Sequence, residues 1–96
     1  MIDNDLAKDV LESFVKKGWS LGSVESLTGG LFSSTICSIP GASRVYKGSI
    51  ISYANEVKEN LAHVKDETIR TYGVVSKEVA EEMALGGLEA LNVNVA

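Results

Sequence analysis

The feature that most constrains this chain is a junction where a short apolar run passes into a helix-like segment across two adjacent glycines. The junction reads VESLTGGLFSST and spans residues 24–35. Glycine is a poor helix former because it loses more conformational freedom on folding than other residues do. Two glycines at a helix start therefore indicate that the backbone there has a conformational or ligand-binding task. The junction also predicts a strand that leads directly into a helix.

Strand-like and helix-like segments alternate along the rest of the chain. Apolar spacing, capping residues and glycine stops predict helices over 3–17, 28–38, 55–61 and 66–72. Ser76 is expected to cap a longer final helix, which Gly86-Gly87 should interrupt while permitting close packing. Strands are predicted over 19–24 and 44–54. This alternation predicts an α/β fold, a layered helix–sheet domain with about two to three strands and four to five helices.

Two details bear on the completeness of this domain. The doubled Ile50-Ile51 suggests that the second strand is buried on both faces. The last five residues, NVNVA, begin an alternating strand-like pattern and then end. One more strand is expected there, so we predict a single domain over 1–96 that is truncated at its C-terminal end.

Composition and charge narrow the class of protein. The formal net charge is -4 and the basic residues are interspersed with acidic ones, which argues against a nucleic-acid binder. No apolar run approaches the length of a membrane span, and the acidic N-terminus lacks a signal-peptide pattern. The single cysteine, Cys37, is expected to be a small buried residue, and its lack of a disulfide partner fits a reducing, cytoplasmic compartment.

The Ser-Leu-Thr-Gly-Gly junction places the hydroxyls of Ser26 and Thr28 beside the unpaired N–H groups of a helix start. Those donors suit an anion, either a phosphate or a developing oxyanion. The alternative is a hydroxyl cap, with the glycines serving tight helix–sheet packing. The spacing fits neither a P-loop nor GxGxxG.

A serine nucleophile at this junction would need a base. His63, the single histidine, has no carboxylate obviously placed to orient it, so a Ser-His-Asp triad has only weak support and a solvent-facing histidine is the alternative. Lys58 would lie in the first turn of a helix capped by Asn55, where the dipole and burial favour a neutral amine. Tyr53, just before that helix, could relay a proton. The alternative is a surface lysine and a tyrosine at the edge of the core.

Three long segments carry a resemblance to a known family. They are VESLTGG, IPGASRVYKGSIISYANEVKENL and YGVVSKEVAEEMALGG. In this order they match the family's usual AESxTGG, PGAS, YxNExK and GxVSxEVAxxMA, and together they are highly specific. The chain thus resembles the C-terminal domain of the CinA (competence/damage-inducible) proteins. That domain also occurs as a stand-alone nicotinamide mononucleotide deamidase.

The resemblance implies an amidohydrolase that converts nicotinamide mononucleotide to nicotinate mononucleotide and ammonia. The family's serine, tyrosine and lysine fall on Ser26, Tyr53 and Lys58. By analogy Ser26 attacks the amide carbon, while Lys58 and Tyr53 handle the proton. The other site residues that the resemblance implies are Glu25, Thr28, Gly29, Gly30 and Asn55.

These further residues carry separate expectations. The N–H groups around Thr28, Gly29 and Gly30 are expected to hold the oxyanion or a phosphate, and Glu25 to orient the loop through hydrogen bonds. Asn55 is open to a capping role instead. Arg44 and Lys47 could contact a phosphate. The alternative is that they are exposed charges at the end of a strand.

The resemblance also implies partners and leaves alternatives. It implies a small-molecule nucleotide substrate, no metal, no organic cofactor and a homo-oligomer. Charge and composition, as described above, predict no nucleic acid and no membrane as partners. Relatives continue beyond the equivalent of Ala96 with segments that contribute to the substrate pocket. A non-catalytic nucleotide- or protein-binding remnant of the domain is therefore the first alternative. A serine amidase acting on another small amide is the second.

Overall fold

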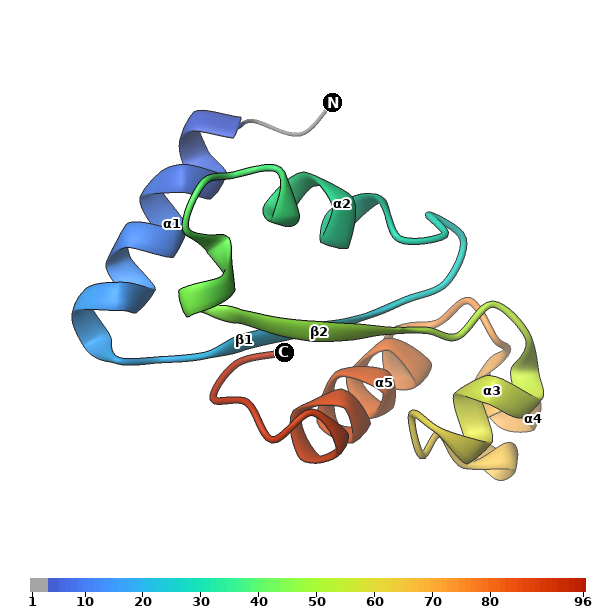
Figure 1. The fold of residues 1–96 in the computed structure, drawn as a ribbon. Coiled ribbons are helices and arrows are strands. Elements are labelled where there is room, and N and C mark those ends of the chain that lie inside the picture. Colours follow the sequence, from blue (N-terminus) through green and yellow to red (C-terminus); the bar gives the residue numbers. More distant parts are fainter. Residues whose placement is uncertain (1–3) are drawn as a thin grey trace.

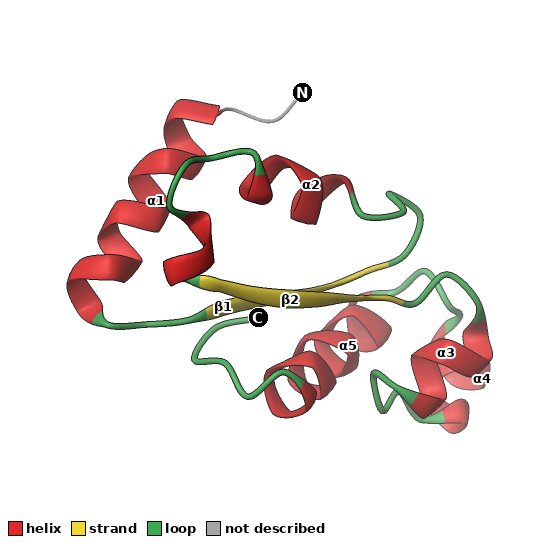
Figure 2. Ribbon diagram, in the orientation of Figure 1, coloured by secondary structure: helices red, strands yellow, loops and turns green. Residues whose placement is uncertain are grey.

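The middle layer of the fold is a pair of parallel strands, β1 (Leu21–Glu25) and β2 (Tyr46–Ile51). This computed structural model describes residues 4–96. Helices α1 and α2 lie over one face of the strands, and α5 lies over the other (Figures 1 and 2). The helices are α1 (Asn4–Lys17), α2 (Leu31–Cys37), the short 3-10 helix η1 (Ala42–Arg44), α3 (Asn55–Asn60), α4 (Asp66–Tyr72) and α5 (Lys77–Ala90). The predicted α/β layered class, with two strands and five α-helices in this part of the chain, is confirmed.

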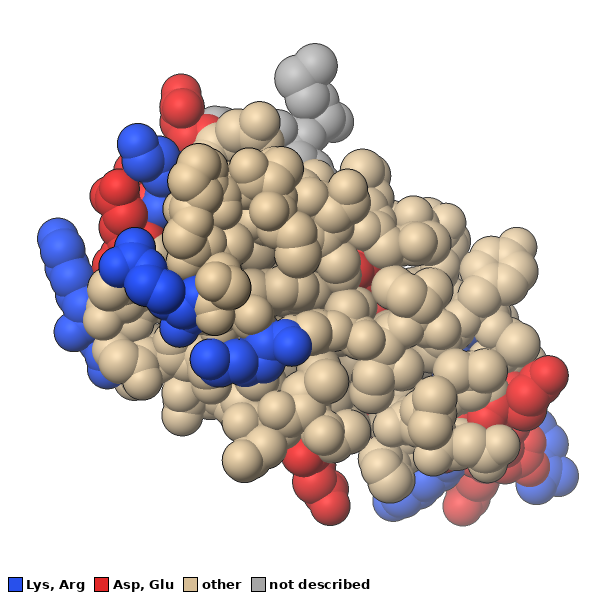
Figure 3. All heavy atoms as spheres, viewed as in Figure 1, with Lys and Arg blue, Asp and Glu red and all other residues tan. Residues whose placement is uncertain are grey.

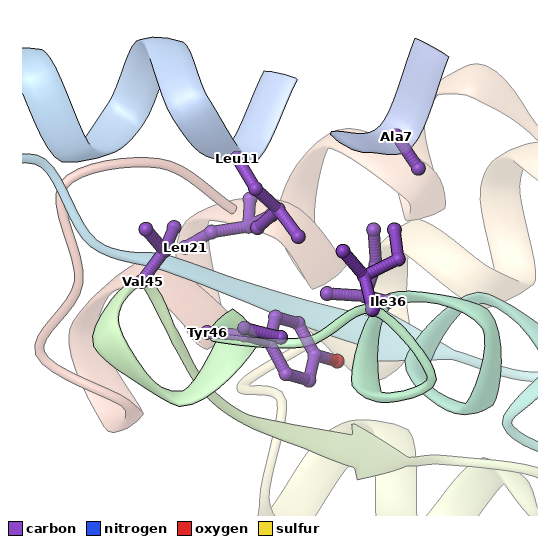
Figure 4. Close-up of a cluster of buried hydrophobic side chains, with 8 residues drawn as sticks. Ala7, Leu11, Leu21, Ile36, Val45 and Tyr46 are labelled. Carbon is purple, nitrogen blue, oxygen red and sulfur yellow. The ribbon is translucent and has the colours of Figure 1, made fainter. Parts of the chain in front are cut away.

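Two apolar clusters hold the helices against the strands. The larger one lies under α1 and α2, where side chains from both helices meet those of the strands (Figure 4). Its buried members include Ala7, Leu11, Leu21, Ile36, Val45 and Tyr46. The smaller cluster, on the α5 side, contains Ala62, Val64 and Val79. Both faces of the strand pair are therefore covered, as parallel strands require.

The parallel register brings the carboxyl ends of both strands to the same edge. Leu21 pairs with Tyr46 at the start of the strands, and Glu25 pairs with Ile51 at their end. The segments that follow, Ser26 onward and Ser52 onward, therefore leave the sheet side by side. Ligand sites in open α/β sheets form outside such carboxyl ends.

Several predicted boundaries are confirmed and others are wrong. α4 and its stop at Gly73 agree with prediction, and the Ser76 hydroxyl caps α5 by accepting from the Val79 N–H at 3.2 Å. The predicted start of the first helix at residue 3 lies outside the described residues. The second predicted strand is shorter, because Arg44 belongs to η1, and Ile51 is 43% exposed rather than buried. Cys37, expected to be buried, is exposed.

The two adjacent glycines in α5 do not interrupt the helix, which runs through them to Ala90. They instead allow close packing, as expected. A Cβ at Gly86 would lie 1.7 Å from the carbonyl oxygen of Ala62, and one at Gly87 would lie 2.4 Å from a Val24 methyl. A helix interior tolerates glycine here because no larger residue fits the gap.

The outer edge of β1 carries a single bridge, in parallel orientation, between Leu21 and Val95. The Gly22 N–H donates to the Val95 carbonyl at 3.0 Å. Beyond that bridge a largely apolar groove of about 480 Å³ runs along β1 between the strand and α5, with Ala96 at one side. In residues 4–96 no helix is long and apolar enough to cross a membrane.

Candidate functional site

The amine of Lys58 lies 3.0 Å from the hydroxyl oxygen of Ser26. Lys58 is only 3% exposed, and its Nζ also donates to the carbonyls of Ser52 and Tyr53 at 2.6 and 3.1 Å. A lysine side chain is seldom buried unless its polar head is fully satisfied. Here three oxygen atoms surround it. The structure therefore brings together two of the three predicted catalytic residues, and the surface-lysine alternative is wrong.

Local geometry explains how a lysine reaches this place. α3 begins just after β2, and helical side chains point back toward the N-terminus of their own helix. Lys58 therefore points at the carbonyls of the segment that enters α3. The helix itself differs from expectation, since its N-cap is Ala54, with no side-chain cap, and Asn55 is its first residue. The predicted cap at Asn55 is wrong, and its side chain is exposed.

Ser52 was missed by the sequence reasoning, although it is central to this geometry. It is fully buried, and both its N–H and its hydroxyl donate to the Glu25 carbonyl, at 2.7 and 3.1 Å. The available signal was a polar residue at the end of an apolar strand. Ser52 thus ties the end of β2 to the residue that precedes Ser26.

The Glu25 carboxylate, directly before Ser26 in the chain, accepts hydrogen bonds from six donors. The residue is 7% exposed. One carboxylate oxygen accepts from the Phe32 N–H at 2.9 Å and the Thr28 hydroxyl at 3.1 Å. The other accepts from the Ser33 N–H at 3.1 Å and from surrounding hydroxyls, those of Ser33, Ser49 and Ser23. The N–H groups of Phe32 and Ser33, in the first turn of α2, therefore donate to a carboxylate of the chain itself.

Glu25 is one of the site residues that the resemblance implies, and its carboxylate is held by these contacts. Its two oxygen atoms are engaged by protein donors, which fits the loop-orienting role expected of it. Burial raises the pKa of Glu25, but hydrogen bonds from the Ser33 hydroxyl and from the N–H groups of Phe32 and Ser33 outweigh it. The pKa therefore lies below its ordinary value of 4.5.

The hydroxyl of Tyr46 completes this buried network. It lies 2.6 Å from the Ser23 hydroxyl and 2.7 Å from that of Ser33. Its ring packs in the larger apolar cluster (Figure 4). Polar residues inside otherwise apolar strands were the only sequence signal for this network, and the sequence reasoning did not use it.

The two glycines of the junction are explained by backbone conformation. Gly29 has φ 61° and Gly30 has φ 109°, values that favour glycine, so α2 begins at Leu31 instead of residue 28. The Gly29 N–H donates to the Ser26 carbonyl at 3.0 Å, closing a turn. That bond engages one of the three N–H groups expected to hold an anion. Within residues 4–96, the N–H groups of Leu27, Thr28 and Gly30 have no hydrogen-bond partner.

A pocket of about 430 Å³ opens beside the Ser26–Lys58 pair. Its polar lining comes from those two residues with Tyr53, Asn55 and Ser76, and its apolar lining comes from the 74–75 segment and from α5. Tyr53 is 76% exposed, and its hydroxyl has no hydrogen-bond partner among the described residues. Its backbone carbonyl, not its side chain, contacts Lys58.

The remaining candidates lie elsewhere. His63 is exposed in the connection between α3 and α4, and no hydrogen bond joins it to Ser26. Arg44 and Lys47 lie near the start of β2, at the opposite end of the strands from Ser26. Lys and Arg side chains on the face seen in Figure 3 gather mainly toward that end. Residues 4–96 contain no group of three or more His, Cys, Asp or Glu that could hold a metal ion.

The sequence matches the CinA C-terminal domain family over residues 3–96. It is 52% identical over 93 residues to a protein of Limosilactobacillus reuteri (strain DSM 20016) that is named as a competence-damage inducible protein. The match covers 97% of this chain and 22% of that protein. The sequence is 47% identical over 91 residues to a CinA-like protein of Prochlorococcus marinus (strain MIT 9515), covering 94% and 21% of the two chains. The chain thus spans about a fifth of the length of these relatives.

Solved structures agree with this match. The competence/damage inducible protein CihA of Agrobacterium tumefaciens superposes with a TM-score of 0.92 at 33% identity, covering 95% of this chain and 55% of that one. A CinA superfamily protein from Klebsiella pneumoniae 700603 gives a TM-score of 0.92 at 26% identity, covering 98% and 59%. The chain belongs to the CinA C-terminal domain family.

Proposed function

We propose that this chain hydrolyses the carboxamide of nicotinamide mononucleotide to nicotinate mononucleotide and ammonia, through an acyl-enzyme on Ser26. The observation that carries the proposal is the buried Lys58 amine, 3.0 Å from the Ser26 hydroxyl oxygen. A nucleophile and base within hydrogen-bond reach, with the base held by further groups, are the mark of covalent catalysis. The resemblance of the surrounding motifs to nicotinamide mononucleotide deamidases supports the choice of substrate.

The contacts of Lys58 suit a base. A neutral amine has two N–H donors and one lone pair. When Lys58 is neutral, the carbonyls of Ser52 and Tyr53 can take the two donors, and the lone pair can then accept from the Ser26 O–H across the 3.0 Å contact. Lys58 then accepts the Ser26 proton as Oγ attacks the amide carbon. It returns that proton to the leaving nitrogen as the C–N bond breaks and ammonia departs.

Deacylation uses Lys58 in the same way, with water as the nucleophile and Ser26 as the leaving group. A water molecule gives its proton to Lys58 and its oxygen to the acyl carbon, and Ser26 regains its proton as nicotinate mononucleotide leaves. The unpartnered N–H groups of Leu27 and Thr28, directly after the nucleophile, are the proposed donors to the oxyanion. Tyr53 and Asn55 line the adjacent pocket, where the proposed roles are proton relay for Tyr53 and substrate contact for Asn55.

A non-catalytic nucleotide- or protein-binding role is the second candidate. The observation that favours it is the outer edge of β1, which carries only the Leu21–Val95 bridge in the described chain and borders an apolar groove. An open strand edge can pair with another segment. In this case the Ser26–Lys58 contact would persist without turnover.

The test is ammonia release from nicotinamide mononucleotide by this chain and by its Ser26→Ala variant, with free nicotinamide as the comparison substrate. Release that disappears in the variant supports the amidase. Faster release from the nucleotide than from free nicotinamide supports recognition of the phosphate, and argues against an amidase for other small amides. No release from a folded wild-type chain that still binds the nucleotide would favour the binding role.

A further inference from the structure

Glu25 is a buried acidic side chain without a cationic partner. The ion pairs in the described chain join Arg70 to Asp66 and Lys77 to Glu81, both on exposed helix surfaces. The Glu25 carboxylate is held instead by hydrogen bonds alone, from two backbone N–H groups and four hydroxyls. Burying a carboxylate is costly unless such donors compensate it. Six donors converging on one side chain indicate that its position is important to the structure around it.

Those donors come from four separate segments. Ser23 belongs to β1 and Ser49 to β2, Thr28 belongs to the loop after Ser26, and Phe32 and Ser33 form the first turn of α2. Ser26, the proposed nucleophile, follows Glu25 directly in the chain. The carboxylate therefore fixes both ends of the loop on which the nucleophile lies.

That loop has little else to hold it. Leu27 is 81% exposed, and both glycines are in conformations open to few other residues. The Thr28 hydroxyl has one side-chain partner, Glu25. Without the carboxylate, the N–H groups of Phe32 and Ser33 and the surrounding hydroxyls would lose their shared acceptor. A displacement of about 1 Å of a reacting group can cost on the order of 100-fold in rate.

We propose that Glu25 is a positioning residue for the nucleophile. Its carboxylate acts as a fixed internal anion that holds the loop of residues 26–30 against α2, and this keeps the Ser26 hydroxyl at the Lys58 amine. The inference rests on the proposed function to the extent that Ser26 must react as a nucleophile. It does not depend on which amide is the substrate.

The experiment measures the rate at which a small activated ester, p-nitrophenyl acetate, acylates Ser26. Mass spectrometry detects the acetylated protein, and the labelling of Ser26→Ala is subtracted as background. Glu25→Gln keeps the shape of the side chain and removes its charge, while Glu25→Ala leaves space for an added carboxylate. Glu82→Gln is the matched control, because Glu82 also accepts from a backbone N–H (Lys65, 2.9 Å) and a hydroxyl (Thr68, 2.7 Å), but between α4 and α5.

We expect Glu25→Gln and Glu25→Ala to lose at least about 10-fold in labelling rate, and Glu82→Gln to label at the wild-type rate. Added formate should restore labelling in Glu25→Ala, and the same concentration of chloride should not. Rescue by a free carboxylate is an effect that a merely structural role would not produce. Melting curves for each variant establish that the labelled protein is folded.

The outcomes separate the two proposals. A wild-type chain that does not label above Ser26→Ala would refute the nucleophile, and the positioning role with it. Wild-type labelling with equal labelling of folded Glu25→Gln would refute the positioning role alone. So would a folded, slow Glu25→Ala that formate fails to restore. Unfolding of both variants would also overturn the proposal, because the carboxylate would then support the whole domain rather than the nucleophile.

Discussion

Ser52 donates two hydrogen bonds to a single acceptor, the backbone carbonyl of Glu25, through its N–H at 2.7 Å and its hydroxyl at 3.1 Å. Its own carbonyl accepts from the Lys58 amine at 2.6 Å. One buried residue therefore joins the segment that carries the proposed nucleophile to the proposed base. Its contribution can be measured separately from theirs.

Ser52→Ala removes the hydroxyl but keeps both backbone hydrogen bonds. We expect a loss of about 0.5–1.5 kcal/mol in the free energy of unfolding, the usual net value of one such bond. The rate of Ser26 acylation should fall several-fold, with KM for the amide unchanged, because only the alignment of nucleophile and base is loosened. Denaturant unfolding and steady-state kinetics would measure both. Ser43→Ala, at an exposed position, is the control, and an equal effect there would contradict this expectation.

Lys58→Met should abolish turnover while leaving a folded chain. General acid–base groups contribute roughly 100- to 10,000-fold, so ammonia release should fall at least that far. Stability should also fall, because the buried carbonyl of Ser52 loses its donor, at about 1–3 kcal/mol for a buried group left unpaired. Lys65→Met replaces an exposed lysine and should behave as wild type in the same assay. Unchanged turnover in a folded Lys58→Met would remove the lysine from the mechanism.

Tyr53→Phe separates the side chain of Tyr53 from its backbone. The carbonyl that holds Lys58 remains, so the melting temperature should not change. If the hydroxyl relays a proton, kcat should fall by about 10-fold or more. Tyr72→Phe is the control, because it removes another exposed phenolic hydroxyl, from a residue that does not line the Ser26 pocket. Equal kcat in wild type and Tyr53→Phe would restrict this residue to its backbone contact.

Gly86→Ala tests the close approach of α5 to the segment after α3. Alanine usually stabilises a helix interior by about 1 kcal/mol relative to glycine. Here the added Cβ would lie 1.7 Å from the Ala62 carbonyl oxygen, a backbone atom that cannot rotate away. We therefore expect a net loss of about 1–3 kcal/mol, or roughly 4–24 °C in melting temperature. Leu85→Ala, at an exposed position of α5, should melt within a few degrees of wild type.

Acid should weaken the fold through Glu25. The pKa of this carboxyl in the folded chain lies below the ordinary 4.5, so the unfolded chain takes up the proton first as pH falls. The stabilisation is fully present above the unfolded pKa and is lost as pH falls through the lower folded pKa. The difference in melting temperature between wild type and Glu25→Gln should therefore begin to shrink as the pH falls below about 4.5, and disappear below the folded pKa.

Glu82 has to be controlled in that comparison. Hydrogen bonds from the Lys65 N–H and the Thr68 hydroxyl lower its pKa as well. Adding Glu82→Gln to both chains removes this second contribution, and the convergence assigned to Glu25 should survive. A constant gap in melting temperature between pH 7 and pH 3 would show that Glu25 does not titrate in this way.

Much of the fold was predictable because it follows from local chemistry. The alternation of strands and helices, the Gly73 stop and the Ser76 cap depend on residues within a few positions of each other. The expected helix start at residue 28 was wrong because two glycines at positive φ extend the loop to Leu31. The expected break at Gly86-Gly87 was wrong because tertiary packing favours glycine there despite its poor helix propensity.

The site was predicted in its residue types but not in its arrangement. By itself, the sequence determined that a serine would follow a strand at a glycine turn and that a lysine would lie in the first turn of a later helix, because these depend on local spacing. The parallel register decided that Ser26 and Lys58 would meet, because it brings two strand ends to one edge.

Tertiary structure also decided which groups hold the Glu25 carboxylate beside the site. Six donors from segments distant in sequence converge on that carboxylate only after the chain has folded. Buried hydrogen bonds of this kind depend on three-dimensional proximity, which local pattern does not encode. The sequence supplied the groups, and packing of the two strands against α2 and α3 brought them within bonding distance.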